Sequence, residues 1–428
     1  MCAKIGEFGI GKLWVLFRRT LKKEGKIMEL RISTVKIILI INCCILLGYS
    51  IASCSGPKKI IDTPPIVKEV EEPFDPAKFF DASALRIYNM SASYPNTLQK
   101  RMLTASLDSL QIKLTTQTKS NSGALQYQTD AFEPMRNSMV EMGMMGKLVL
   151  ALACARKMEA YKIKGIKYSS TMIIESAGRD LPGTYNDPFA PQGRPSLAQY
   201  LARMLMHNDV DAYNRILEFV TIEGVNEFAK FNGWNSTTIT SRLGRTYSLS
   251  ENASMNTINF YDDNNRKIFI QPNSFSSQSK IKTRYANTTS LDDMESIVLS
   301  LCTNQFRNKD LNSQIGEDRL EYLKLLLFNP QTILNYAGAA NQNATGSLFF
   351  PNLKPSDKLM LLPITVTNDS GMSEVLYYND LKTGKVFILS ASLLFKYSEA
   401  EKGFEKELKD GRQMFEDLGK ATLSQRSN

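Results

Sequence analysis

The strongest constraint on the fold is the order of strand-like and helix-like patterns along the chain. Apolar and polar residues alternate over 110–118 and 124–130, which predicts a hairpin. After a long block of helical periodicity, three further strand-like segments occupy 358–368, 373–380 and 385–395. This order predicts an α+β fold: one five-stranded antiparallel sheet built from both chain ends, with an all-helical lobe inserted.

The helical periodicity recurs in several segments between the two sets of strands. We expect helices at 146–160, 196–205, 211–220, 224–233, 290–302 and 317–328. A closing helix is predicted over 398–418, where apolar residues from Phe404 to Leu418 share one broad face. A polar stretch at about 249–285 interrupts the helices, and we expect a surface excursion that contains one strand.

Composition and charge limit the class of protein. The chain has 428 residues, of which 43% are hydrophobic, so it can form one large or two small globular domains. The formal net charge is +9, but residues 1–53 hold nine Lys/Arg against three Asp/Glu and therefore carry +6 of it. Because the rest of the chain is nearly balanced, the sequence gives no electrostatic reason to expect nucleic acid as a partner.

The leader has the features of an export signal. Residues 37–51 are apolar, are preceded by Arg31 and Lys36, and are too short for a confident membrane span. They lead into the sequence IASC, which resembles the bacterial lipobox and so implies that Cys54 is lipidated and becomes the mature N-terminus. An ordinary secretory signal or membrane anchor is the alternative. We expect translation to start at Met28, since residues 1–27 would make an unusually long basic region.

A tether separates the lipid anchor from the folded body. Residues 54–76 mix proline with both charges and show no periodicity, and about twenty such residues reach roughly 65 Å when extended. In bacterial lipoproteins, a residue other than Asp after the lipidated cysteine implies routing to the outer membrane. Here that residue is Ser55, and we expect the protein on the periplasmic face of that membrane. The folded domain is predicted over 77–428.

Metal and cofactor chemistries find little support in the residue counts. His207 is the single histidine, so zinc sites built on paired histidines are excluded. Beyond Cys54 the chain has only Cys154 and Cys302, both in apolar helical segments that favour buried, inert thiols. No Ser-His-Asp elbow motif accompanies His207. We expect no cofactor and no bound metal.

The helical block resembles the class A serine β-lactamase and penicillin-binding-protein family. The stretches that carry the resemblance are GKLVLALACARKMEA, SLAQYLARMLMHNDVDAYNRIL, IEGVNEFAKFNGW and NTTSLDDMESIVLSL. The resemblance covers roughly residues 100–420. It implies the fold predicted above and a cleft built from three catalytic motifs, each of which can be compared by position.

The first motif is Ser-x-x-Lys at the start of a buried helix. In the family this serine attacks the substrate carbonyl, and the lysine lies one turn further on. Here the stretch is Met-Met-Gly-Lys, from Met144 to Lys147. A thioether has no proton to give up, so Lys147 has lost its partner.

The second motif is Ser-Asp-Asn, whose serine relays a proton and whose asparagine holds the lysine and the substrate. The matching residues are Asn208, Asp209 and Val210. Only the aspartate is retained, and in the family that residue mainly braces the loop.

The third motif is Lys-Thr/Ser-Gly on the strand that lines the cleft. The chain has a literal Lys-Thr-Gly at 382–384, but glycine there fits a hairpin turn between the last two strands. The resemblance instead points to Asp369, Ser370 and Gly371, where an acid replaces the lysine. At 4 Å and an effective dielectric of 20, two unit charges interact by about 4 kcal/mol, so this change disfavours a substrate carboxylate.

Two interpretations follow. In the first, the protein is a lipid-anchored pseudoenzyme that binds a cell-wall peptide, a glycan or an envelope protein. In the second, it is a serine hydrolase of β-lactamase or D,D-peptidase type with displaced residues, and Ser138 is the local substitute to test. A purely structural tethered domain is a third possibility, which a filled, apolar cleft around Met144 would favour.

The lipid anchor can be tested by labelling. We expect labelled palmitate to be incorporated into the wild-type protein and lost in Cys54→Ala, because the thiol of Cys54 is the acylated group. Cys302→Ala is the matched control and should remain labelled. Soluble secretion of unmodified wild-type protein would contradict the anchor.

Overall fold

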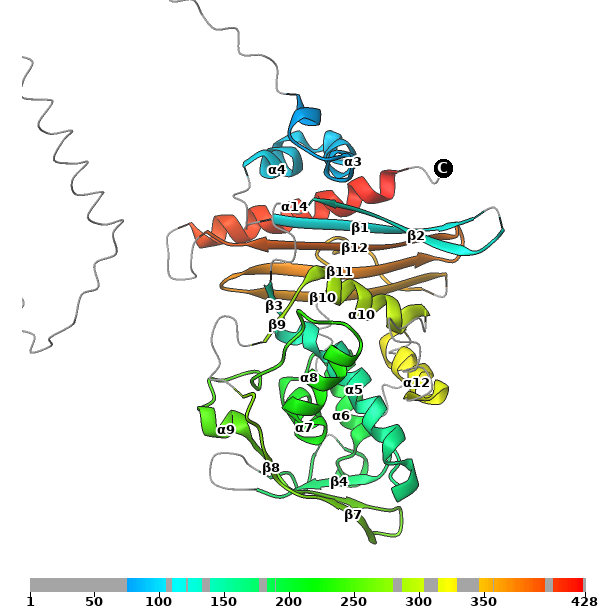
Figure 1. Ribbon diagram of the computed structural model, residues 1–428, viewed down its shortest axis with the longest axis vertical. Coiled ribbons are helices and arrows are strands. Elements are labelled where there is room, and N and C mark those ends of the chain that lie inside the picture. Colours follow the sequence, from blue (N-terminus) through cyan, green and yellow to red (C-terminus); the bar gives the residue numbers. More distant parts are fainter. Residues whose placement is uncertain are drawn as a thin grey trace, which may run out of the picture. The chain divides into compact units, whose positions relative to one another are not determined.

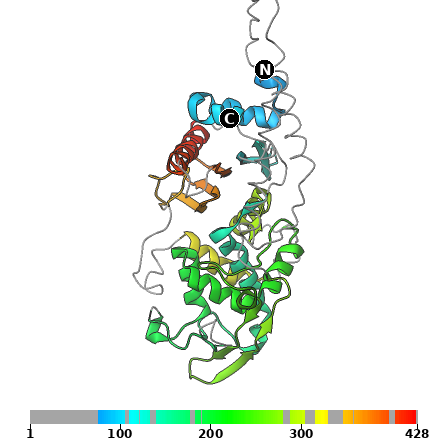
Figure 2. The same ribbon diagram turned by 90° about the vertical axis from the view of Figure 1, so that its left-hand side faces the viewer.

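The computed structural model describes residues 75–104, 110–120, 122–132, 139–176, 183–188, 190–279, 287–303, 315–328, 346–356, 358–396 and 403–425. Contacts divide the chain after Pro73, and Phe74–Asn428 forms one compact unit (Figures 1 and 2). The predicted leader, Met28, Cys54 and the tether up to residue 74 lie outside the described residues. Within the described ranges, no helix has the length and apolar character needed to span a membrane.

The main sheet has the predicted strands from both chain ends. Its order is β10-β11-β12-β1-β2, and all neighbours are antiparallel. The strands are β1 (Leu110–Lys119), β2 (Leu125–Phe132), β10 (Leu359–Asn368), β11 (Gly371–Asp380) and β12 (Lys385–Leu394). Leu110 pairs with Leu393, so the first strand closes directly onto the last. The predicted α+β class and five-stranded sheet are confirmed.

The sheet is the middle layer between two apolar cores. On β11, Met372 and Leu376 face one core, whereas Val375 and Tyr377 face the other, as the two-residue period of a strand requires. The first core lies under α3 (Ala82–Met90) and α14 (Phe404–Ser424). The second lies between the sheet and the helical lobe (Figure 1). Because β11 is buried on both faces, large apolar or aromatic residues occupy consecutive positions from Val375 to Tyr378, and the polar residues Ser373 and Glu374 are buried as well.

The helical lobe follows the predicted segments closely. Its helices are α5 (Lys147–Ala160), α6 (Leu197–His207), α7 (Val210–Val220), α8 (Ile222–Phe231), α10 (Leu291–Thr303) and α12 (Glu317–Phe328). Shorter helical elements are α4 (Lys100–Thr104), α9 (Leu249–Ala253), η1 (Pro76–Lys78), η2 (Ser91–Ser93), η3 (Pro95–Gln99), η4 (Gly143–Gly146), η5 (Lys162–Lys164) and η6 (Pro191–Gly193). Ten residues of α5 are buried, so it is the central helix of the lobe.

The described part of the polar stretch, residues 249–279, is less superficial than its sequence predicts. The KIFIQ segment is a strand as expected, but it belongs to a three-stranded sheet in the order β4-β6-β7. Ile258 and Phe260 of β6 are fully buried. The small strands are β3 (Val140–Glu141), β4 (Thr171–Ile174), β5 (Ser254–Met255), β6 (Ile258–Tyr261), β7 (Lys267–Gln271), β8 (Ser274–Phe275) and β9 (Thr288–Thr289).

The closing helix ends later than its apolar face suggests. It begins at Phe404 and continues six residues past Leu418, to Ser424. Ala421 and Thr422 are almost fully buried, and a side chain on Gly419 would collide with the carbonyl of Phe349. Small residues therefore extend the packed face of this helix beyond the last large apolar residue.

A buried ion cluster joins the lobe to the excursion. Glu218 of α7 lies 3.2 Å from the guanidinium of Arg242 and 3.5 Å from that of Arg215. Glu218 is 2% exposed and Arg242 is 1% exposed. Arg242 also donates to the carbonyl of Ser254, at 2.8 Å, which fixes the start of the excursion. A buried charge of this kind is tolerated only because its partners are present.

We expect Glu218→Ala to lower the free energy of unfolding by about 3 to 5 kcal/mol, because it leaves Arg242 as an uncompensated buried charge. Urea unfolding followed by circular dichroism would measure the loss. Glu227→Ala, at an exposed position on α8, is the control and should change stability by less than about 0.5 kcal/mol. Equal effects of the two substitutions would contradict the role of the cluster.

Candidate functional site

The turn before α5 holds the position of the family nucleophile. Met144 lies in η4, one short 3₁₀ turn, and α5 begins at Lys147. Gly143 adopts a left-handed conformation, with φ of 44°, and a β-carbon there would lie 3.3 Å from Val366 of β10. Met144 is half-buried and packs against the larger core. The structure therefore places a thioether, one turn before Lys147, against the sheet.

Lys147 is buried and its amine is occupied. The Nζ atom donates to Asn208 Oδ1 at 2.6 Å and to the carbonyl of Leu205 at 3.2 Å. Lys147 is 6% exposed, and burial lowers its pKa to about 8. The structure thus brings the first and second motif positions together.

Asn208 reaches Lys147 because α6 ends there in a left-handed turn. Its φ is 52°, a conformation that asparagine tolerates better than most residues. Its side-chain oxygen accepts from the lysine, so this oxygen satisfies part of the charge that burial would otherwise leave unpaired. An amide in this place holds the amine but cannot relay a proton as a hydroxyl can.

Asp209 has the structural role that the resemblance implies. Its carboxylate caps α7 by accepting from the Ala212 amide at 3.0 Å. It also pairs with Arg203 at 2.5 Å, and Arg203 in turn lies 2.6 Å from Asp187. Val210 is the first residue of α7 and packs against the core. These residues fix the loop and bring no reactive group to it.

The third motif position lies in a hairpin turn. β10 extends through Asn368, which pairs with Gly371, so Asp369 and Ser370 are the two turn residues. Asn368 Oδ1 accepts from the amides of Ser370 and Gly371, at 2.9 and 3.1 Å, and so shapes the turn. A side chain on Gly371 would meet the carbonyl of Leu393 at 2.4 Å. The sequence predicts a position on the cleft-lining strand, whereas the structure places it just beyond the strand's end.

Glu141 contacts the third motif position, and the sequence does not predict this contact. Its Oε2 accepts from Asn368 Nδ2 at 2.9 Å and from Ser370 Oγ at 3.1 Å. Asn368 and Ser370 are each more than two hundred residues from Glu141 in the sequence. The local sequence around Glu141 therefore does not predict these contacts. The hollow beside Glu141 and Ser370 has a volume of only about 20 Å³, far below the roughly 300 Å³ of a small-ligand pocket.

The remaining candidates are placed as follows. The literal Lys-Thr-Gly at 382–384 forms the turn between β11 and β12, with Gly384 at a φ of 71°, as its glycine predicts. Ser138 lies outside the described residues. Both Cys154 and Cys302 are free thiols, and burial raises the pKa of Cys154 to about 12. The parts of the chain that are described contain no group of three or more potential metal ligands.

Comparisons with known proteins agree with the sequence resemblance. The model of the β-lactamase enzyme family matches residues 136–323. This match confirms the resemblance to the β-lactamase and penicillin-binding-protein family for that part of the chain. A search of curated proteins finds no match.

Several solved structures are similar at low identity. A β-lactamase from Xanthomonas campestris pv. campestris is 14% identical, with 79% of this chain and 98% of that chain covered and a TM-score of 0.44. A representative of class A β-lactamase from Bacteroides cellulosilyticus is 12% identical, with 81% and 100% covered and a TM-score of 0.46. A β-lactamase from Sphaerobacter thermophilus is 12% identical, with 80% and 97% covered and a TM-score of 0.45.

The buried amine of Lys147 predicts a specific pH dependence of stability. In the unfolded chain its pKa is the ordinary value of about 10.4, so the unfolded state binds more protons between about pH 8 and pH 10.4. The contribution of Lys147 to stability therefore rises with pH across this window. We expect the free energy of unfolding of the wild type, relative to Lys147→Met, to rise by about 2 kcal/mol between pH 7 and pH 10.

Urea unfolding at several pH values would measure this difference. Lys267→Met removes an exposed lysine and should show no such change with pH. A difference between wild type and Lys147→Met that stays constant from pH 7 to pH 10 would contradict the depressed pKa.

Proposed function

Because residues 136–323 match the β-lactamase family, we propose that this protein is a lipid-anchored envelope protein whose β-lactamase-like domain has lost hydrolysis and binds a partner. The anchor is Cys54, in the outer membrane on its periplasmic side. The bound component is a cell-wall peptide, a glycan or an envelope protein.

The observation that carries this proposal is the state of Lys147. A serine one turn earlier would need this amine as a nearby base or proton relay. Met144 offers no hydroxyl, and the amine is held by Asn208 Oδ1 and the Leu205 carbonyl. The Lys147 amine, which hydrolysis would need, is therefore engaged in hydrogen bonds within the fold.

Two carboxylates near the end of β10 would repel an anionic β-lactam, which supports the loss of β-lactam recognition. The strength of the repulsion depends on how exposed each carboxylate is. Asp369 is exposed, so at 4 Å its repulsion of a substrate carboxylate is close to the water limit of about 1 kcal/mol. Glu141 is half-buried and lies in the same turn region, where an effective dielectric of 20 gives about 4 kcal/mol at that distance. Glu141 therefore contributes more electrostatic repulsion of an anionic substrate than Asp369 does.

A second candidate function rests on Ser370. Its hydroxyl lies 3.1 Å from the Glu141 carboxylate, a serine beside a potential base. This pair is the observation that favours an active hydrolase with displaced residues. Against it, Ser370 is 7% exposed, the same hydroxyl also contacts Asn368 Oδ1 at 2.9 Å, and the adjoining hollow is about 20 Å³.

A reactive penicillin separates the two functions. We expect no acyl adduct by mass spectrometry when the protein without its leader is incubated with benzylpenicillin, because Met144 cannot form the acyl-enzyme. A stable adduct would contradict the proposal, and the modified peptide would identify the nucleophile. An adduct on Ser138 or Ser370 would support the displaced hydrolase.

Restoring one residue is a further test of the same proposal. We expect Met144→Ser to give no turnover of a chromogenic cephalosporin, because Asn208 still cannot relay a proton and no lysine replaces Asp369. Catalytic groups that act as a unit are strongly non-additive, so one repair recovers little. Met145→Ser, in the same turn, is the matched control. Turnover by Met144→Ser but not by Met145→Ser would show that the machinery is intact apart from its nucleophile.

A further inference from the structure

A tight turn directly after α5 exposes a large aliphatic side chain between lysines. The turn is η5 (Lys162–Lys164), and Gly165 follows it. Ile163, at its centre, is 91% exposed, the largest exposed fraction of any large hydrophobic residue in the described ranges. Since almost all of this apolar side chain is in water, a partner that covers it gains binding free energy.

Backbone hydrogen bonds fix the turn in a projecting position. The Lys164 amide donates to the carbonyl of Tyr161 at 2.9 Å, and the Gly165 amide donates to that of Lys162 at 3.0 Å. Gly165 is left-handed, with φ of 73°, and a β-carbon there would have no neighbour within 4 Å. The turn therefore projects into open space and presents Ile163 outward.

Strand β7 supports the turn from one side. The Lys164 Nζ atom lies 4.0 Å from the centre of the Phe269 ring and 5.0 Å from that of Tyr161. The two rings meet edge to face, with centres 5.1 Å apart. Both are half-buried. The exposed isoleucine thus belongs to a small surface that also holds a supported cation and two aromatic rings.

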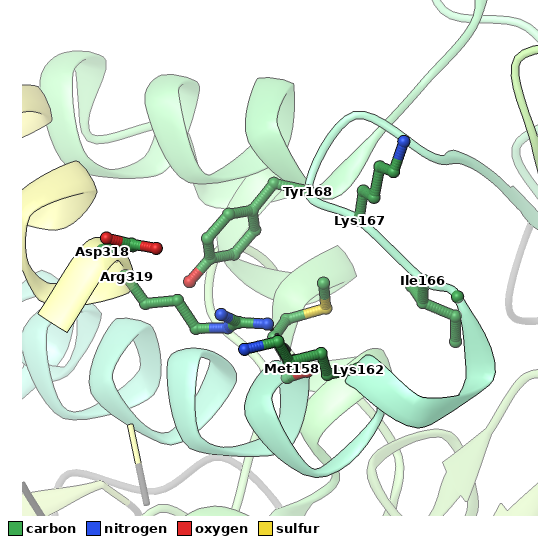
Figure 3. Close-up of a pocket in the computed structure, with 8 residues that line it drawn as sticks. Met158, Lys162, Ile166, Lys167, Tyr168, Asp318 and Arg319 are labelled. Atoms are coloured by element: carbon green, nitrogen blue, oxygen red, sulfur yellow. Dashed lines mark hydrogen bonds between the residues drawn. The ribbon is translucent and has the colours of Figure 1, made fainter. Parts of the chain in front are cut away.

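The turn lies at one end of the compact unit. In Figure 1, β7 and the last turns of α5 are at the opposite end of this unit from α3. Lys162 and Lys167 are both exposed there. Lys167, in the loop after the turn, points away from Tyr168 and Arg319 (Figure 3). The lysines therefore stand around Ile163 at a surface that other parts of the unit leave open.

Positive charge is concentrated in this turn. Residues 161–167 contain three lysines and no acid. Glu159 lies 2.8 Å from Arg319 and 3.6 Å from Lys162, and Asp318 lines the pocket below the turn. Four cations against these two carboxylates leave a formal charge of +2. The neighbouring β6–β7 turn adds no net charge, because its acids and cations balance: Asp262, Asp263, Arg266 and Lys267.

This combination of groups fits a lipid surface better than other anionic partners. A nucleic acid or an acidic polymer would pair with the lysines but leave Ile163 in water. A specific protein interface buries about 800 Å² on each partner, more than a three-residue turn offers. At a membrane, anionic headgroups attract lysines, and an aliphatic side chain enters the boundary between headgroups and acyl chains. We infer that this turn is a membrane-contact site that inserts Ile163 among anionic phospholipids.

Vesicle sedimentation tests this site with the protein without its leader, because residues 74–428 form one compact unit. One set of vesicles is an equimolar mixture of phosphatidylcholine and phosphatidylglycerol, and the other is phosphatidylcholine alone. We expect binding to the mixed vesicles to be about twentyfold tighter, since each of two net charges near an anionic surface contributes about fivefold. Neither the lipid anchor nor hydrolysis enters this assay, so the site and the proposed function can fail separately.

Substitutions in the turn separate its apolar and charged contributions. Ile163→Ala should weaken binding to the mixed vesicles by about tenfold, because less apolar surface leaves water. Lys167→Gln should weaken it by about fivefold. The matched controls are Leu381→Ala and Lys382→Gln, an exposed aliphatic residue and the lysine beside it in the β11–β12 turn, and both should bind as the wild type does. All four side chains are exposed, so the thermal unfolding temperatures should not change.

Tryptophan fluorescence separates insertion from electrostatic attraction alone. Without the leader, Trp234 is the single tryptophan of the chain, and it is fully buried. Ile163→Trp adds one exposed tryptophan, whose emission should move to shorter wavelength when mixed vesicles are added. Leu381→Trp is the control and should show no such change.

Four results would overturn this site. The first is equal binding to the two kinds of vesicle, and the second is unchanged binding of Ile163→Ala. The third is an unshifted emission of Ile163→Trp with the mixed vesicles. The fourth is binding of polyglutamate without binding of vesicles, which would assign the turn to an acidic protein.

Discussion

The burial of β11 on both faces is the constraint on which the rest of the structure depends. Every residue from Gly371 to Tyr378 is buried, so the strand needs a neighbour on each side and a core above and below. One neighbouring pair, β12 and β1, joins strands from opposite ends of the domain, with Leu110 against Leu393. The helical lobe is thus a long insertion between paired strands. Because loop-closure entropy grows only logarithmically with length, such an insertion is tolerated.

The residues at the motif positions each make structural contacts in this fold. A buried amine is costly in an apolar core, and here Asn208 and the Leu205 carbonyl accept from it. Met144 adds an apolar side chain to the same edge of the core. Asp209 keeps the loop in place through Arg203 and the start of α7. Each of these residues makes a packing, hydrogen-bond or ion-pair contact within the fold, which is the pattern expected under the proposed loss of hydrolysis.

Sequence reasoning succeeded where the information is local. The bounds of α12 follow from its periodicity, and the position of the turn between β11 and β12 follows from Gly384. It failed where a contact joins distant residues: the Glu141–Ser370 pair depends on β3 meeting the end of β10, which no local pattern encodes. The pairing of β6 with β4 is a similar case, because the excursion looks polar until a partner strand covers Phe260.

The two ends of α5 differ in how their polar groups are satisfied. At the first end, Lys147 has acceptors at 2.6 and 3.2 Å, and the hollow beside Ser370 is about 20 Å³. At the other end, the Tyr168 hydroxyl and the Arg319 Nε–H have no hydrogen-bond partner among the described residues, and both atoms are inaccessible to solvent. An unpaired buried donor costs about 1 to 3 kcal/mol, so the polar groups at this end are less well satisfied. The family resemblance draws attention to Lys147, whose amine has two acceptors, whereas the unsatisfied donors lie at the opposite end of the helix.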